Sequence, residues 1–180
     1  MPRQELTHIV HLRDLAEGPV DLEIEADEVA RAALARRFGL DDIEELGARV
    51  VVQREGRGMR VSGHFHGKPV QRCVTTDRPV ASSVAEDFTV VFLPEIAQAV
   101  NAGGEQAVDV DTEEDFEPLI SDCVDIGEVV AQSFSLALDP YPRSPEAGAM
   151  GEGDDYDENP SRNEEPDSPF AVLKNLRDMT

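Results

Sequence analysis

The stretch RVSGHFHGKPVQRCVTTDRPVASSVAEDFTVVFLP, residues 60–94, decides the fold of this chain. In its first half, apolar or small residues alternate with polar ones, as expected for a strand that buries one face. One face would carry Val61, Gly63, Phe65 and Gly67, and the other Arg60, Ser62, His64, His66 and Lys68. Pro69 has no N–H to donate, so it interrupts the ladder or marks an edge of the sheet.

Extended runs lie on both sides of this strand. Downstream, residues 70–75 resume extended structure, residues 77–79 turn, and an apolar face continues through Val84, Phe88, Val90 and Phe92. Upstream, Leu46, Ala48, Val50 and Val52 alternate with other residues, and Gly56-Arg57-Gly58 supplies a hairpin turn. The pattern predicts an antiparallel meander.

The first fifty residues predict two short strands and a helix. Residues 8–12 and 20–24 are strand-like, the second alternating apolar and acidic residues. Asp27 is typical of a helix N-cap, and Gly39 of a helix end. The buried stripe would be Val29, Ala33, Leu34 and Phe38, with Arg31, Arg36 and Arg37 on a solvated face.

Residues 95–123 lose the pattern, so we expect a mobile loop there, with a possible short strand at residues 107–110. Asp125 then predicts the N-cap of a second helix, with Glu128 at the third helical position of a near capping box. Its buried stripe would be Ile126, Val129, Val130, Phe134 and Ala137, and Asp139-Pro140 would end it.

The chain therefore predicts three parts. Residues 1–144 would form an α+β domain, an antiparallel sheet or incomplete barrel of five to seven strands with two packed helices. Residues 145–168, rich in Pro, Gly, Glu and Asp, would be a disordered acidic linker. Residues 169–180 would form a short helix whose three anchors are Phe170, Leu173 and Leu176. So short a helix is marginal alone in water, so we expect it to dock on something.

Charge is unevenly distributed along the 180 residues, which carry 38 acidic and 16 basic side chains for a net charge of −22. Residues 105–128 hold ten acidic and no basic residues, and residues 146–168 nine acidic residues and one Arg. The two cysteines do not make a disulfide framework. Neither a signal sequence nor an apolar run of membrane-spanning length is visible. We expect a cytoplasmic protein that does not enter a membrane.

Three separated motifs carry a family resemblance. The first comprises Gln71-Arg72-Cys73-Val74-Thr75, Pro79-Val80 and Phe88-Thr89-Val90-Val91-Phe92. The second is Asp125-Ile126-Gly127-Glu128 followed by Leu136-Ala137-Leu138-Asp139-Pro140-Tyr141-Pro142, and the third is Pro169-Phe170-Ala171-Val172-Leu173-Lys174-Asn175-Leu176. Together they resemble the YceD family of large ribosomal RNA subunit accumulation proteins, also known as domain of unknown function 177. The resemblance implies a bacterial, non-enzymatic factor in ribosome biogenesis that supports accumulation of large-subunit (23S) ribosomal RNA.

A metal site is one interpretation of His64, His66 and Cys73, because imidazole and thiolate groups bind zinc and the three are close in sequence. A zinc site needs three or four converging ligands. Some relatives have Cys-x-x-Cys at the positions of Val70 and Cys73, and further ligands after the second motif, where this chain has Arg143-Ser144. We therefore expect no metal, with Cys73 a buried or half-buried structural thiol and Cys123 incidental.

Catalytic patterns are also missing from the sequence. The acidic run from Asp109 begins like a calcium loop, but Glu114 stands where glycine is needed and Ile120 where glutamate is needed. Nucleophile-elbow, phosphate-loop and dinucleotide motifs do not occur. We expect no catalytic residues and no cofactor, with a metal-dependent RNA-processing nuclease as the enzyme alternative.

Two modes of binding remain open. The residues Arg60, His64, His66, Lys68 and Arg72 form a candidate interaction face for ribosomal RNA, although a net charge of −22 repels phosphates. Alternatively, the acidic segments could attract a basic large-subunit ribosomal protein, for which the chain would act as an acidic chaperone. In either mode, Phe170, Leu173 and Leu176 are candidate docking anchors.

Overall fold

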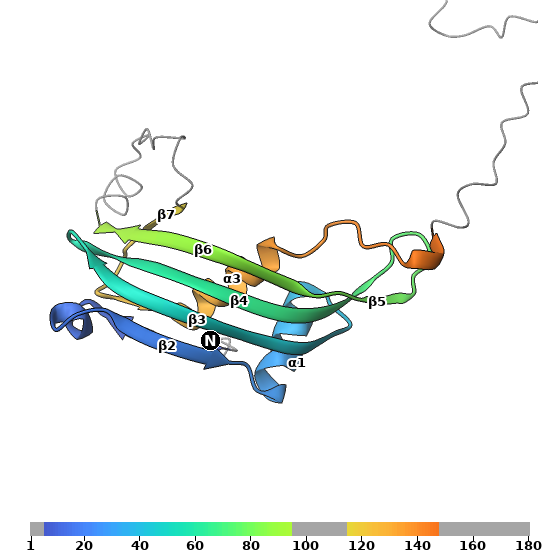
Figure 1. Cartoon of the computed structure of the whole chain (residues 1–180), viewed down its shortest axis with the longest axis horizontal. Coiled ribbons are helices and arrows are strands. Elements are labelled where there is room, and N and C mark those ends of the chain that lie inside the picture. The colour runs from blue at the N-terminus through green and yellow to red at the C-terminus, as the bar shows by residue number, and fades with distance from the viewer. Residues whose placement is uncertain (1–5, 95–114, 148–180) are drawn as a thin grey trace, which may run out of the picture.

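A computed structural model describes residues 6–94 and 115–147 of the chain (Figure 1). Its main sheet has six strands: β2 (Val20–Glu25), β3 (Asp42–Glu55), β4 (Gly58–Arg72), β5 (Pro79–Ala81), β6 (Val84–Leu93) and β7 (Asp115–Pro118). The order is β2-β3-β4-β6-β7, and β5 pairs with the end of β4. The remaining described elements are the strands β1 (Ile9–His11) and β8 (Cys123–Asp125), the helices α1 (Glu28–Phe38) and α3 (Ile126–Leu136), and the 3₁₀ turns η1 (Leu12–Ala16) and η2 (Pro145–Ala147).

The long hairpin of β3 and β4 forms the centre of the sheet, as the sequence predicts. Gly56 has a φ of 56°, the left-handed conformation that glycine adopts without a steric penalty. Gly58 starts β4 where a Cβ would lie only 1.8 Å from the carbonyl oxygen of Phe92 on the neighbouring strand. Antiparallel pairing then runs from Glu55 opposite Gly58 to Asp42 opposite Val70. The two glycines fix the turn, and the turn fixes the register.

Pro69 lies inside β4 and not at the edge of the sheet. The pairing of β4 is irregular on both sides of this residue: a bulge on β3 falls between Ile43 and Glu45, and the pairing on the other side passes from β6 to β5. The predicted interruption of the ladder is therefore confirmed, because the missing N–H falls where regular pairing already breaks.

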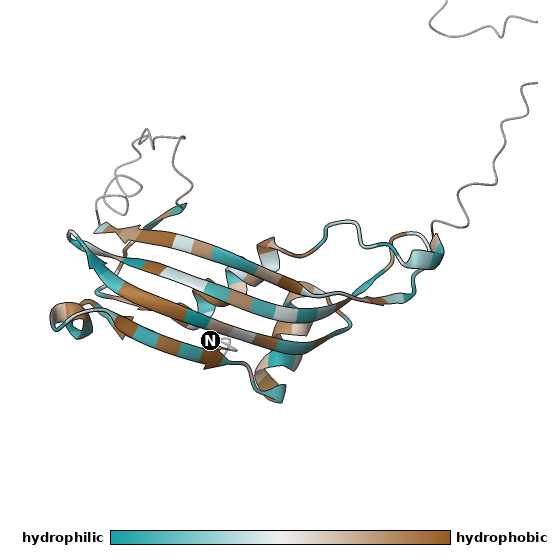
Figure 2. Cartoon of the chain, in the orientation of Figure 1, coloured by the Kyte–Doolittle hydropathy of each residue, from teal (hydrophilic) through white to brown (hydrophobic). Residues whose placement is uncertain are grey.

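Both helices cover one face of the sheet, and the core lies between (Figure 1). Phe65 of β4 meets Phe134 of α3 edge-on, with ring centroids 6.3 Å apart. Gly67, two residues further along the same face, leaves room for that ring, since a Cβ there would lie 2.6 Å from Phe134 Cε2. Apolar and polar residues alternate along the central strands (Figure 2), which is the pattern of a sheet buried on one side.

Both predicted ends of the first helix are confirmed, but part of its predicted buried face was wrong. The second helix starts after the predicted N-cap, Asp125, but ends at Leu136, before the predicted stop at Asp139-Pro140. The Asp27 side chain accepts from Ala30 N at 2.7 Å, and Gly39 closes α1 with a φ of 69°. Val29, predicted to be buried, is 78% exposed, because α1 packs through Ala30, Leu34 and Ala35 instead.

Arg31 was wrongly predicted to be solvated. Its side chain is half-buried and donates from Nε to the Ile43 carbonyl at 3.0 Å and from NH1 to the Ala26 carbonyl at 2.8 Å. Arg31 therefore ties α1 to β3 and to the residue that follows β2.

The prediction of a loop over residues 95–123 is wrong for the part that the structure describes, residues 115–123. Residues Asp115–Pro118 form β7, which pairs parallel to β6, with Phe116 opposite Val91. Leu119 follows and is buried, and Cys123 already belongs to β8, which pairs antiparallel with β1. The acidic composition of this segment is typical of a loop. The strand forms nevertheless, because Phe116 in β7 and Leu119 directly after it provide enough apolar packing for a short edge strand.

The α+β fold is confirmed: of the two forms expected, an antiparallel sheet or an incomplete barrel, the described residues form an open, mostly antiparallel sheet. The second, two-stranded sheet of β1 and β8 was not expected. The suggested strand at residues 107–110 and the segments 148–168 and 169–180 lie outside the described residues. The boundaries between the three predicted parts, 1–144, 145–168 and 169–180, stay predictions. The first three residues of the expected linker form η2.

Candidate interaction face

Four of the five candidate face residues project from β4 on the side turned away from the helices. We call this side of the main sheet the outer face. Phe65 and Gly67 contact α3 on the inner face, and side chains alternate along a strand, so Arg60, His64, His66 and Lys68 point outward. Arg72 ends the same strand, where β5 pairs with it.

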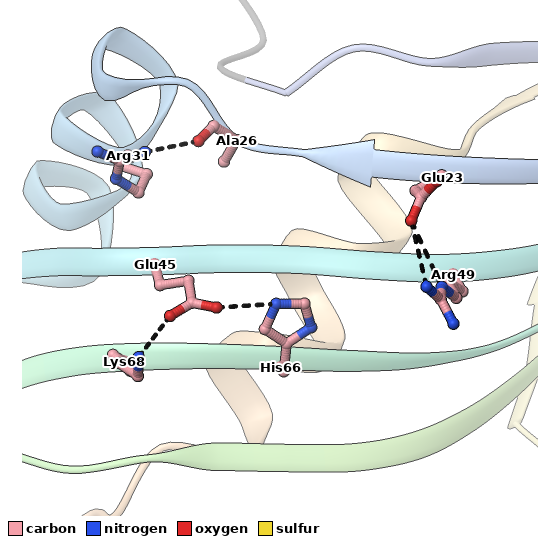
Figure 3. A network of polar contacts seen from close by, with 7 residues as sticks. All are labelled: Glu23, Ala26, Arg31, Glu45, Arg49, His66 and Lys68. Atoms are coloured by element: carbon pink, nitrogen blue, oxygen red, sulfur yellow. Dashed lines mark hydrogen bonds and ion pairs between the residues drawn. The ribbon is translucent and has the colours of Figure 1, made fainter.

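Glu45 binds two of the candidates at once (Figure 3). Its Oε2 lies 2.5 Å from Lys68 Nζ and its Oε1 lies 3.2 Å from His66 Nε2. The Lys68 ammonium lowers the pKa of the Glu45 carboxyl, and Glu45 in turn raises the pKa of Lys68. Lys68 is thereby already neutralised by a carboxylate from the neighbouring strand.

His64 has a carboxylate partner on the other neighbouring strand. Its Nδ1 lies 2.8 Å from Asp87 Oδ1 of β6, the residue directly opposite in the ladder. On the β3 side, Arg49 faces His64 in register. Arg49 Nε lies 3.4 Å from Glu23 Oε1 of β2 (Figure 3). A row of polar side-chain pairs, His64–Asp87 and Arg49–Glu23, therefore crosses the sheet at this level.

The two arginines at the ends of β4 are paired as well. Arg60 Nε lies 3.2 Å from Glu55 Oε2. Arg72 Nε lies 3.0 Å from Asp41 Oδ1, and its NH1 donates to the Asp77 carbonyl at 3.2 Å. Each of the five candidates thus contacts an acidic residue.

The outer face is consequently not a basic patch. With histidines counted as neutral, the five candidates contribute three positive charges, Arg60, Lys68 and Arg72. The acidic side chains in ion-pair contact with the five are also five in number: Asp41, Glu45, Glu55, Asp77 and Asp87. Phosphates bind by meeting unneutralised cations and releasing counterions. A phosphate here would have to displace a carboxylate from each cation.

Sequence reasoning found the cations and missed their partners. The carboxylates come from β3, β6 and the flanking turns, so reading β4 alone gives a face without acid. The Glu45–Lys68 pair could have been predicted from the hairpin turn. The turn places Glu55 opposite Gly58, and counting back along both strands from there places Glu45 opposite Lys68.

The cysteine and histidine candidates do not converge. Among residues 6–94 and 115–147, no three His, Cys, Asp or Glu side chains are arranged to hold a metal ion. Cys73 is buried as predicted, only 2% exposed, and accepts from the backbone N–H of Ser144 at 3.3 Å and of Thr76 at 3.4 Å. Hydrogen bonds from the Thr76 side chain and the Ser144 backbone lower the pKa of the Cys73 thiol to about 6.

The first two sequence motifs meet in space around this thiol. Gln71 Nε2 donates to the Asp139 carbonyl at 2.8 Å, and Val74 N donates to the Pro142 carbonyl at 2.9 Å. Arg78 also forms an ion pair with Glu146 of η2. The chain leaving α3 is therefore fastened along the end of β4.

Asp125 and Gly127, at the start of the second motif, are both required by contacts with the N-terminal segment. Asp125 Oδ1 accepts from Gly127 N at 3.1 Å and from His8 N at 2.8 Å, so it caps α3 and holds the N-terminal segment. Gly127 has no room for a side chain, since a Cβ would lie 1.7 Å from the Leu6 carbonyl oxygen. Glu128 binds Arg37 of α1 through both carboxylate oxygens, at 2.8 Å and 2.5 Å, in place of the predicted capping box.

A family model described as large ribosomal RNA subunit accumulation protein YceD matches residues 61–177, which is 117 of the 180 residues. The chain belongs to the YceD family. The match confirms the resemblance read from the three motifs, all of which lie within residues 61–177. No curated protein and no solved structure matches the chain.

The YceD match starts at Val61, inside β4, so it leaves out β2, α1 and β3. Four of the candidate face residues lie within it, whereas Glu45 and Glu23, which bind the outer face from β3 and β2, do not. Among the described residues, no helix is long and apolar enough to cross a membrane.

Proposed function

We propose that this YceD-family chain is a non-enzymatic cytoplasmic factor that supports large-subunit ribosomal RNA accumulation by binding a basic large-subunit ribosomal protein. The family match supports the link to ribosomal RNA. The choice of a protein partner rests on one observation, the carboxylate contact made by every cation of the candidate face.

The surplus charge of the molecule is negative on the described surface as well as in the sequence. Asp115 and Glu117 of β7 are exposed carboxylates without an ion-pair partner among the described residues. A net charge of −22 attracts a basic protein and accelerates its association at low salt. Such binding would hold the ribosomal protein until it meets its RNA, acting as an acidic chaperone.

A pull-down from lysate at low salt, divided and treated or not with ribonuclease, tests this proposal. We expect one basic ribosomal protein of the large subunit to survive ribonuclease and to leave at high salt, because surface charge pairs are screened by salt. If large-subunit RNA is recovered and all proteins disappear with ribonuclease, direct RNA contact replaces the proposal.

Direct RNA contact through the outer face is the second candidate. It is favoured by the alignment of Arg60, His64, His66 and Lys68 on one strand, with Arg72 at its end. A variant in which His64, His66, Lys68 and Arg72 are all replaced by neutral glutamine tests it. Full retention of function would remove the outer face as an RNA site, while loss of RNA from the pull-down would support it.

A further inference from the structure

We propose that the C-terminal segment, residues 169–180, docks in a groove between α3 and β7 of its own chain. The groove consists of two hollows, of about 270 Å³ and about 280 Å³, that share Phe92, Glu117, Val129 and Gln132 in their walls. The first continues to Ile120 and Cys123, and the second to Leu136. We call these two hollows together the α3–β7 groove.

Apolar side chains stand uncovered at both ends of the groove. Ile120 is 85% exposed and Leu136 is 83% exposed, while Phe92 in the shared wall is half-buried. Single exposed apolar residues are common on protein surfaces, but several along one groove indicate a docking surface. The segment at residues 169–180 offers three apolar anchors, Phe170, Leu173 and Leu176, at the spacing of one helix face.

The charges of groove and segment are complementary. Asp115 and Glu117 line the groove on the β7 side. After residue 145 the chain has only three basic residues, and two of them, Lys174 and Arg177, directly follow the anchors Leu173 and Leu176. The acidic residues 146–168 are repelled by this surface, so the basic-flanked anchors are the part of the C-terminal region that fits it.

The connecting chain is long enough to reach the groove. Twenty-two residues separate Ala147 from Phe170, which allows a span of about 75 Å when extended. Phe92 in the groove pairs with Met59 at the start of β4, and Ala147 lies near the other end of that 15-residue strand, which spans about 50 Å. A tether of this length gives an effective concentration on the order of millimolar, so even weak docking is populated.

Cys123 reports occupancy of the groove, because its thiol lies in the wall and is half-buried. The test uses the full chain with Cys73→Ser, so that only Cys123 reacts, and measures its alkylation rate with iodoacetamide. We expect the triple variant Phe170→Ala, Leu173→Ala, Leu176→Ala to react roughly tenfold faster, because the cover is removed. Asp115→Asn with Glu117→Gln should raise the rate less.

The matched control is Asn175→Ala, which lies in the same segment off the anchor stripe and should leave the rate unchanged. All substitutions in residues 169–180 lie outside the described residues 6–94 and 115–147. A change in the alkylation rate therefore reports whether the segment covers Cys123, and not unfolding of the domain. Equal rates in the parent chain and the triple variant would overturn the proposal. Protection that rises with protein concentration would overturn docking within one chain and show a second copy as the occupant. The proposal does not depend on which partner the chain binds.

Discussion

At the scale of single residues, backbone hydrogen bonds from Thr76 and Ser144 hold the buried thiol of Cys73. Its sulfur accepts hydrogen bonds that favour the thiolate, and its pKa falls from an ordinary value near 9 to about 6. Between these pH values the unfolded chain binds more protons than the folded chain. The free energy of unfolding should therefore rise with pH across this window, and its extra contribution should be lost as the pH falls through about 6.

This prediction is checked in a Cys123→Ser chain, in which Cys73 alone titrates. Ultraviolet absorbance of the thiolate should appear with a midpoint of about pH 6. Denaturation of the same chain and of the Cys73→Ser variant should diverge between pH 6 and 9. Parallel stability curves would show that the hydrogen bonds to the sulfur do not favour the thiolate.

Gly127 gives a second prediction at this scale. Helix propensity alone would make Gly127→Ala stabilising by about 1 kcal/mol. A Cβ would lie 1.7 Å from the backbone oxygen of Leu6, so we expect the clash to dominate and the variant to lose about 3 kcal/mol. Urea unfolding measures the difference. A Gly127→Ala chain as stable as the parent would contradict the close approach.

At the scale of elements, the central hairpin was predictable because its turn, its alternation and its length agree. The glycines at the turn give the register, and the register gives the cross-strand pair of Glu45 and Lys68. The face of α1 was not predictable in the same way. Val29 and Ala30 differ by one position on the helix, and only packing against the sheet decides which of the two is buried. The parallel strand β7 was also out of reach, because its short, acidic sequence is typical of a loop and only its pairing with β6 makes it a strand.

Arg37 and Glu128 join the two helices, and we predict a coupling of about 1 kcal/mol between them, since the pair is bidentate but partly exposed. The Arg37 side chain lowers the pKa of Glu128, so the coupling should be lost as the pH falls below the ordinary glutamate value of 4.5. A double-mutant cycle with Arg37→Gln and Glu128→Gln measures it. The cycle is needed because Arg37 also lies over the Phe38 ring. A coupling unchanged at about pH 3 would contradict the ion pair.

At the scale of the whole molecule, charge separates the two binding modes. The family and the α+β class were predictable from separated motifs and hydrophobic alternation. The candidate face was only half predictable: its cations lie on one strand, but the carboxylates that neutralise them come from three other parts of the chain. A net charge of −22 then favours a basic protein as the partner.

The most direct test of the central claim is the ratio of large-subunit to small-subunit ribosomal RNA in cells of the source organism that lack this chain. We expect the ratio to fall and to be restored by the parent chain. The glutamine variant of His64, His66, Lys68 and Arg72 should also restore it, because these residues are already paired with carboxylates. A ratio that stays normal without the chain would contradict a role in accumulation of large-subunit ribosomal RNA.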